Sequence, residues 1–281
     1  MLKRKLYKAC FITSSFIFIS VAAGSKPISK KPATKAPVVH KAGTQQFDSS
    51  GICTCIPFTA NIELVNAPRI QLNKNAAPFV KDYIKKNGFL LNKTKNRTAP
   101  YFTIIDSVFE QNKVPVELKY LAFIESGLKY NAISWSGAVG PWAFMPVAAK
   151  QYGLKISRHT DERLDYYKSS YAAAGLLTDL FAKYGDWLLV IAAYNSGPGW
   201  VSKAIKKSGN SNYWALQHFL PEETRKHVKK FIAVHYYFEG HGSLATMTKA
   251  ETEKHIKALE TFVAKQQELE KNDSLSAVVV K

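Results

Sequence analysis

Hydrophobic residues in the middle of the chain recur with the period of an α-helix. The clearest case begins at Pro115, which suits a first helical turn because its missing N–H is not needed there. It ends before Gly127, which suits the position just past a helix end. One face of this helix collects apolar residues spaced three and four apart: Leu118, Leu121 and Ala122. Glu125 continues that face, so a carboxyl group stands where an apolar residue is expected.

Two interpretations of Glu125 follow from this helix. A carboxyl group held against apolar surface is a candidate general acid, because such surroundings favour the protonated form. A second apolar face is made by Tyr120, Phe123 and Ile124, and at the edge of that face Glu125 would be a surface residue of the last turn. The helix alone leaves both interpretations open.

The same periodicity predicts an all-α protein, because no stretch alternates in the way that a large sheet requires. Gly185 is expected to end one helix and Asp186 to cap the next. In chain order, helices are expected at residues 79–88, 98–109, 115–126, 145–152, 168–184, 187–194, 199–207, 213–219, 221–238 and 248–271.

The first residues have the features of an export signal. Basic residues between Lys3 and Lys8 precede an apolar stretch that ends at Ala23 and is short for a membrane span. We therefore expect residues 1–23 to be a signal peptide, with an uncleaved anchor as the alternative, and residues 24–75 to be a flexible Lys/Pro-rich linker and N-terminal segment. An exported, periplasmic protein is the consequence.

Cysteines and histidines indicate no metal site or cofactor. Cys53 and Cys55 are too few for a disulfide scaffold, and a local disulfide, a pairing between chains and a reduced pair all remain open. The histidines show no spacing typical of metal ligands, so we expect no metal and no cofactor.

The composition is strongly basic, with a formal net charge of +18. Such an excess is typical of proteins that bind nucleic acid, but an export signal separates the chain from nucleic acid and no binding motif stands out. We therefore expect no nucleic-acid partner. A basic surface also favours association with anionic cell-wall peptides or an anionic membrane surface, or serves solubility alone.

Several short motifs follow one another along the middle of the chain. They are Glu125-Ser126-Gly127, Ser134-Trp135-Ser136-Gly137-Ala138-Val139-Gly140, Phe144-Met145-Pro146, Asp161-Glu162-Arg163-Leu164-Asp165, Gly185-Asp186-Trp187, Ala193-Tyr194-Asn195-Ser196-Gly197-Pro198-Gly199 and Leu220-Pro221-Glu222-Glu223-Thr224-Arg225. In this order and spacing they resemble the soluble lytic transglycosylase (SLT) domain family, in the branch of membrane-bound lytic murein transglycosylase D. The set is more specific than any single motif.

This resemblance implies a lysozyme-like helical domain with a substrate cleft over residues 76–240, followed by a charged helical tail over residues 241–281. Its members are lytic transglycosylases, which cut peptidoglycan glycan strands between N-acetylmuramic acid and N-acetylglucosamine and close a 1,6-anhydro ring without consuming water. Peptidoglycan is therefore the expected partner, and the oligomeric state is left open.

The resemblance assigns both proton transfers of this reaction to Glu125. Ordinary glycosidases use two carboxyl groups, whereas the acidic residues between Asp161 and Asp165 are expected to form a salt-bridged turn with Arg163. In the family, the single glutamate protonates the bridging oxygen and then takes the proton of the C6 hydroxyl, as reversible proton transfer allows. The N-acetyl group of the substrate stabilises the developing positive charge.

The resemblance also indicates residues around the acid. Tyr194 is expected beside it, although a core tyrosine is the alternative. Ser134 matches a serine that binds the catalytic carboxyl group or the N-acetyl group, and Asn195 shapes the helix end or faces the sugar. Phe144 either presents a ring to a sugar or joins the core, and Glu223 completes the predicted substrate-binding set.

Two residues depart from the family. Ala143 stands where a substrate-contacting Gln is usual, and His227 where a Tyr is usual. A histidine there would make activity sensitive to pH near neutrality. The loss of the Gln leaves room for a catalytically weak peptidoglycan-binding or scaffold protein, and a lysozyme-type hydrolase is the other alternative.

Overall fold

The structure, a computed structural model, describes residues 45–47, 53–55 and 67–279, with side chains described for residues 67–271. The predicted signal peptide lies outside the described residues. Within the predicted linker segment, β1 (Gln45–Phe47) pairs antiparallel with β2 (Cys53–Cys55).

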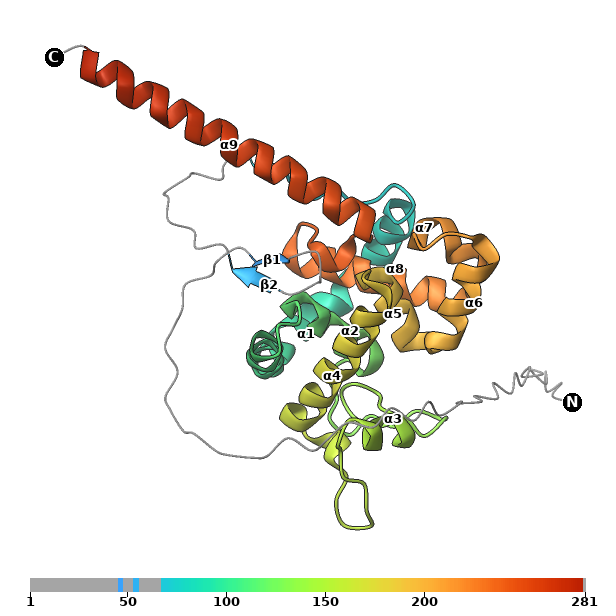
Figure 1. The fold of residues 1–281 in the computed structure, drawn as a ribbon. Helices are drawn as coiled ribbons and strands as arrows, with labels where there is room; N and C mark the ends of the chain where they lie inside the picture. Colours follow the sequence, from blue (N-terminus) through green and yellow to red (C-terminus); the bar gives the residue numbers. More distant parts are fainter. Residues whose placement is uncertain (1–44, 48–52, 56–66, 280–281) are drawn as a thin grey trace, which may run out of the picture. The chain divides into compact units, whose positions relative to one another are not determined.

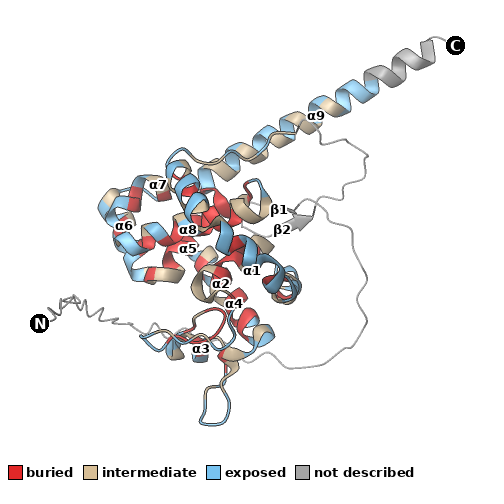
Figure 2. Ribbon diagram, turned by 180° about the vertical axis from the view of Figure 1, so that it is seen from behind, coloured by how far each residue is buried: buried red, intermediate tan, exposed pale blue. Residues whose placement is uncertain are grey.

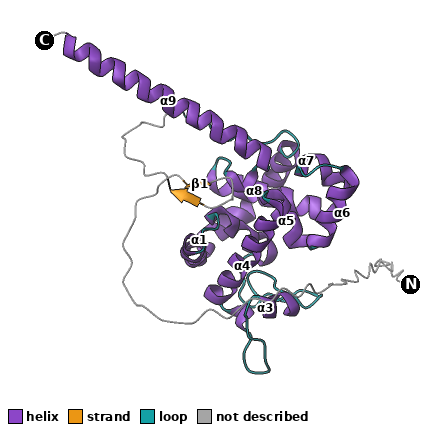
Figure 3. Cartoon of the chain, viewed as in Figure 1, coloured by secondary structure: helices purple, strands orange, loops and turns teal. Residues whose placement is uncertain are grey.

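In the remainder of the described chain, helices are joined by loops and turns without a further named strand, and the predicted all-α class is confirmed for residues 67–279 (Figures 1 and 3). The α-helices are α1 (Ala77–Gln111), α2 (Lys119–Ser126), α3 (Pro146–Gln151), α4 (Tyr166–Tyr184), α5 (Trp187–Ser196), α6 (Pro198–Ser208), α7 (Tyr213–Leu216), α8 (Glu222–Glu239) and α9 (Lys249–Val279). Short 3-10 turns are η2 (Val116–Leu118), η3 (Glu162–Leu164), η4 (Gln217–Phe219) and η5 (Leu244–Thr246).

Helix α1 runs without a break through a region where the sequence predicts one. The predicted end at Gly88 and new start near Pro100 are wrong, because tertiary contacts override these local signals. The Tyr237 hydroxyl of α8 donates to the carbonyl of Gly88 at 3.1 Å. Thr98 is fully buried and donates to carbonyls in the turn before Pro100, the residue that lacks an N–H. The two predicted helices are therefore one.

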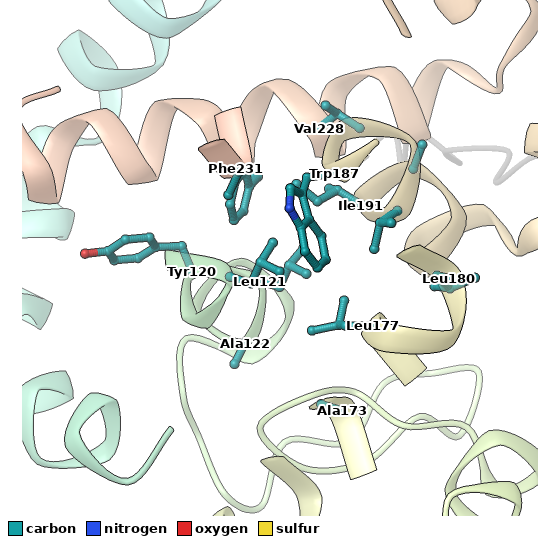
Figure 4. Close-up of a cluster of buried hydrophobic side chains, with 14 of the residues drawn as sticks. Tyr120, Leu121, Ala122, Ala173, Leu177, Leu180, Trp187, Ile191, Val228 and Phe231 are labelled. Atoms are coloured by element: carbon teal, nitrogen blue, oxygen red, sulfur yellow. The ribbon is translucent and has the colours of Figure 1, made fainter. Parts of the chain in front are cut away.

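Helix α5 lies at the centre of the packed helices. Its residues from Trp187 to Ala193 are at most 6% exposed, and α4, α6 and α8 pack against it (Figure 2). Side chains from four helices meet there, as Figure 4 shows: Leu121 of α2, Leu177 of α4, Trp187 and Ile191 of α5, and Val228 and Phe231 of α8. Each such side chain contributes about 1.5–3 kcal/mol by burial. One core thus fixes the ends of α2, α5 and α8, where the predicted site residues lie.

The chain beyond residue 240 packs onto the same helices. Ala245 of η5 belongs to the core, and the Lys249 N–H at the start of α9 donates to Asp186 Oδ2 at 2.8 Å. Asp186 Oδ1 accepts the Leu189 N–H at 3.0 Å, so the predicted cap of α5 is confirmed. Burial raises the pKa of Asp186 to about 6.

None of the helices between residues 67 and 279 has the length and apolarity needed to cross a membrane.

A buried histidine of α8 makes stability depend on pH. His235 is fully buried beside the ring of Tyr120, with centroids 5.7 Å apart, and burial lowers the pKa of His235 to about 3. In the unfolded chain His235 binds a proton below about pH 6.5, whereas in the folded protein it stays neutral down to about pH 3. The free energy of unfolding therefore falls as the pH drops from about 6.5 toward 3. We expect His235→Phe to remove this loss and to gain about 2 kcal/mol over wild type between pH 6.5 and pH 5, measured by urea unfolding.

The comparison with wild type isolates His235. Asp186 contributes with the opposite sign, because its raised pKa lets the native state bind a proton from about pH 6 downward, but it is present in both proteins. The exposed His218 provides a control, and His218→Gln should leave the pH dependence unchanged. Equal pH slopes for wild type and His235→Phe would contradict the prediction.

Candidate active site

Glu125 lies on the last turn of α2, directly before the helix ends. Gly127 adopts the predicted left-handed conformation, with φ 63°. The apolar face predicted for this helix is fully buried: Leu118, Leu121 and Ala122. The side chain of Glu125, at the end of that face, is 18% exposed. The structure therefore favours the buried-face interpretation of Glu125 over the surface one.

The carboxyl group of Glu125 is hydrogen-bonded to a histidine. His227 Nε2 lies 2.8 Å from Glu125 Oε1, and the His227 side chain is 9% exposed. His227 comes from α8, which packs against α2. Sequence reasoning found His227 as a departure from the family but missed it as a partner of Glu125. The two are 102 positions apart, and only the packing of α2 on α8 brings them together.

Tyr194 approaches the same carboxyl group from α5. Burial of the phenol and then the negative charge of Glu125 raise the pKa of Tyr194 well above its ordinary value. The Tyr194 hydroxyl donates to the carbonyl of Trp142 at 2.6 Å. This hydrogen bond therefore holds the loop between α2 and α3 in place, and the effect of the Glu125 charge on the Tyr194 pKa indicates that the two groups are neighbours.

The loop between α2 and α3 is tied to the surrounding helices. Ser126 Oγ, next to the acid, donates to the carbonyl of Pro141 at 2.7 Å. The buried Trp142 indole donates to Ser170 Oγ of α4 at 2.9 Å. Gly140, with φ 85°, passes so close to η3 that an added Cβ would lie 2.0 Å from the carbonyl oxygen of Arg163. The loop beside Glu125 is therefore fixed before any ligand binds.

A buried guanidinium group supports this loop from the other side. Arg163 is 6% exposed and pairs with both carboxylate oxygens of Asp161, at 2.9 and 2.7 Å. Its Nη1 donates to the carbonyls of Gly137 at 3.2 Å and Phe144 at 3.0 Å. Hydrogen bonds from Arg163 hold the pKa of Asp161 below its usual range. The predicted salt-bridged turn is confirmed. Through Arg163 it also donates hydrogen bonds that support the loop between α2 and α3.

Removing this guanidinium group should destabilise the protein strongly. Arg163→Met leaves the Asp161 carboxylate and two loop carbonyls without their donor, so we expect a loss of about 3 kcal/mol in the free energy of unfolding. Urea unfolding measures it. The matched control is Lys168→Met in the neighbouring ion pair with Glu162, whose lysine side chain is 52% exposed, and it should cost less than about 1 kcal/mol. Equal losses for the two variants would contradict the role of Arg163.

The remaining predicted site residues have different surroundings. Ser134 closes a turn, because its Oγ accepts the Ala138 N–H at 2.9 Å. Asn195 Oδ1 accepts the Thr224 hydroxyl at 2.9 Å, which joins the end of α5 to α8. Glu223 is exposed on the first turn of α8. Phe144 is 3% exposed and packs in the core, so of its two predicted roles the structure shows the core role.

Aromatic side chains of the loop divide into two groups. Trp142, like Phe144, is buried, whereas Trp135 is 94% exposed and Ile133 is 74% exposed on either side of Ser134. Trp135 is therefore the most exposed apolar side chain of the loop, and it can offer an apolar face to a ligand. Among the described residues, no three His, Cys, Asp or Glu side chains are arranged so that they could hold a metal ion.

Comparison with known proteins gives a family match for part of the chain. Residues 104–217 match the model described as the transglycosylase SLT domain, a stretch that includes Glu125 and Tyr194 but not His227. The chain is 36% identical over 157 residues to the membrane-bound lytic murein transglycosylase D of Escherichia coli (strain K12). That match covers 54% of this chain and 34% of the relative, so the chain spans about a third of that protein. The resemblance drawn from the motifs is confirmed.

Two further similarities concern a second relative and the fold. A tributyltin chloride resistance protein of Alteromonas sp. (strain M-1) is 36% identical over 115 residues, covering 41% of this chain and 56% of that protein. The structure of the 70-kDa soluble lytic transglycosylase in complex with bulgecin A aligns with a TM-score of 0.50 and 21% identity. This alignment covers 64% of this chain and 30% of that one. It confirms the lysozyme-like helical fold and concerns the fold alone.

Proposed function

We propose that this chain, which carries a transglycosylase SLT domain, is an exported lytic transglycosylase of the cell envelope. It cleaves the bond between N-acetylmuramic acid and N-acetylglucosamine in peptidoglycan and leaves a 1,6-anhydro end. A periplasmic location follows from the export signal expected at residues 1–23, and the curated relative is described as membrane-bound.

The environment of Glu125 is the observation that carries this proposal. Its carboxyl group is mostly buried, hydrogen-bonded to His227 and set beside a fixed loop. The acidic groups between Asp161 and Asp165 are committed elsewhere. Asp161 pairs with Arg163, Glu162 pairs with Lys168, and Asp165 caps α4. This arrangement supports a mechanism with one catalytic carboxyl group rather than the usual pair.

In this mechanism Glu125 acts first as an acid and then as a base. Its proton passes to the bridging oxygen as the bond from that oxygen to C1 of N-acetylmuramic acid breaks. The carboxylate then takes the proton of the C6 hydroxyl as O6 bonds to C1, so Glu125 regains its proton and no water is consumed. The positive charge that develops on the sugar is stabilised by the carboxylate and by the substrate's own N-acetyl group.

The substrate-binding residues remain proposals with unequal support. Tyr194 lies within electrostatic range of Glu125 and holds the loop, and Ser134 is on the exposed part of that loop beside Trp135. Asn195 and Glu223 lie at the ends of α5 and α8 that flank the acid. Phe144 supports the loop from the core and contributes indirectly.

Product analysis tests the proposal. Purified sacculi are digested with the mature protein, and the muropeptides are identified by mass spectrometry. We expect products that end in 1,6-anhydro-N-acetylmuramic acid. Reducing ends would show a lysozyme-type hydrolase. An absence of products with retained binding to sacculi would show a scaffold protein, and Ala143 would then be the first residue to revert to Gln.

A further inference from the structure

His227 presents its two ring nitrogens to very different surroundings. Nε2 lies 2.8 Å from Glu125 Oε1, whereas Nδ1 is buried and has no hydrogen-bond partner among the described residues. The whole residue is 8% exposed. A buried N–H without an acceptor is costly, and such orphaned donors are rarer in folded proteins than unpaired acceptors. The surroundings therefore favour a ring that carries no proton on Nδ1.

This condition selects one state of the histidine. The imidazolium form carries protons on both nitrogens, and one neutral tautomer carries its proton on Nδ1. Only the neutral tautomer protonated on Nε2 avoids an unpaired N–H at Nδ1 and still makes the observed contact. In that state Nε2–H donates to Glu125 Oε1, which must then be an acceptor.

We infer that neutral His227 is a positioning residue that reserves Oε2 of Glu125 as the oxygen carrying the catalytic proton. The inference rests on the proposed acid–base role of Glu125. Because Oε1 accepts from His227, the proton of the acid form sits on Oε2. Oε2 then delivers it to the bridging oxygen and later receives the proton of the C6 hydroxyl.

A second ionisable group near the carboxyl group, Tyr194, does not compete for this task. Tyr194 approaches from α5, but its hydroxyl donates to the carbonyl of Trp142. Its raised pKa keeps it protonated, so it adds no charge to the site. Glu223, the other predicted site residue on α8, is exposed on the first turn of that helix. The hydrogen bond from α8 is thus what orients the carboxyl group.

A ring-nitrogen NMR spectrum tests the tautomer without depending on activity. The protein is labelled with the heavy, NMR-active nitrogen isotope in its histidine rings. The His227 signals are assigned as those that disappear in His227→Gln. At pH 7 we expect a protonated Nε2 and an unprotonated Nδ1. A proton on Nδ1, alone or together with Nε2, overturns the inference even if the protein proves to be no enzyme.

The pH profile of kcat/KM tests the consequence. His227→Leu removes the donor that stabilises the carboxylate. We expect the alkaline limb to move up by about one pH unit and kcat to fall about tenfold. His227→Gln restores a neutral N–H donor and should bring the limb back to the wild-type position, while the exposed His218→Gln serves as the control.

Each kinetic outcome decides the inference. An unmoved limb in His227→Leu would show that the hydrogen bond does not act on Glu125. If the alkaline limb of the His227→Gln profile shifts as far as that of His227→Leu, a neutral N–H donor does not suffice. The charge of the histidine would then set the position of the limb. If wild type releases no anhydro product, the proposed function fails, and the NMR spectrum alone then decides the state of His227.

Discussion

Replacing Glu125 with Gln should reduce the release of anhydro-muropeptides from sacculi by about a hundred- to ten-thousand-fold. Gln has nearly the same shape, and its carbonyl oxygen can still accept a hydrogen bond from His227. It cannot give up and regain a proton, so both steps of the proposed reaction fail. Turnover is followed by mass spectrometry of the products, and binding by co-sedimentation with sacculi.

Loss of turnover is meaningful only if the variant folds and binds. Glu125→Gln should unfold within about 1 kcal/mol of wild type and still sediment with sacculi. The matched control is Glu222→Gln on the first turn of α8, whose side chain is 67% exposed and paired with Lys226. It should cleave at the wild-type rate. A Glu125→Gln protein that cleaves as fast as wild type would show that another group is the acid.

Adding a single methyl group at Gly140 should destabilise the protein by about 3 kcal/mol or more. The new Cβ would lie 2.0 Å from the carbonyl oxygen of Arg163, and the backbone φ of 85° is itself unfavourable for alanine. Either the loop beside Glu125 or the η3 turn must move. We therefore expect Gly140→Ala to lose turnover together with stability, as measured by urea unfolding and by product release.

A glycine of the same loop separates crowding from backbone strain. Gly137 has φ 88°, but a Cβ there would meet no atom within 4 Å. Gly137→Ala should therefore cost only the conformational strain, about 1–2 kcal/mol. Equal losses for the two variants would mean that the close approach of Gly140 to Arg163 contributes nothing.

Features that depend on neighbours in the sequence could be predicted. Gly127 ends α2 and Asp186 caps α5 because each signal acts within one helical turn. The turn around Arg163 follows from an acid two residues away, to which the guanidinium group binds. The apolar face leading to Glu125 follows from helical spacing, but that spacing leaves the buried and surface interpretations of Glu125 open, and the family resemblance identifies it as the candidate acid.

Features that depend on contacts between distant segments could not be predicted from the sequence. Gly88 and Pro100 are reliable local signals for a helix end, and packing of α1 against α8 and α4 overrides both. The pairing of Glu125 with His227 requires the register of α2 on α8, which no periodicity specifies. Phe144 has the same hydrophobic character whether it faces a ligand or the core, and only the packed structure distinguishes the two.

The most direct test of a single acid–base carboxyl group at Glu125 is digestion of sacculi in water labelled with a heavy oxygen isotope. Products are weighed by mass spectrometry. The proposed mechanism consumes no water, so it predicts 1,6-anhydro ends of unlabelled mass from wild type, and at least about a hundredfold less of these products from Glu125→Gln. Product ends that carry one heavy oxygen atom would contradict it, because a second group would then have to activate water.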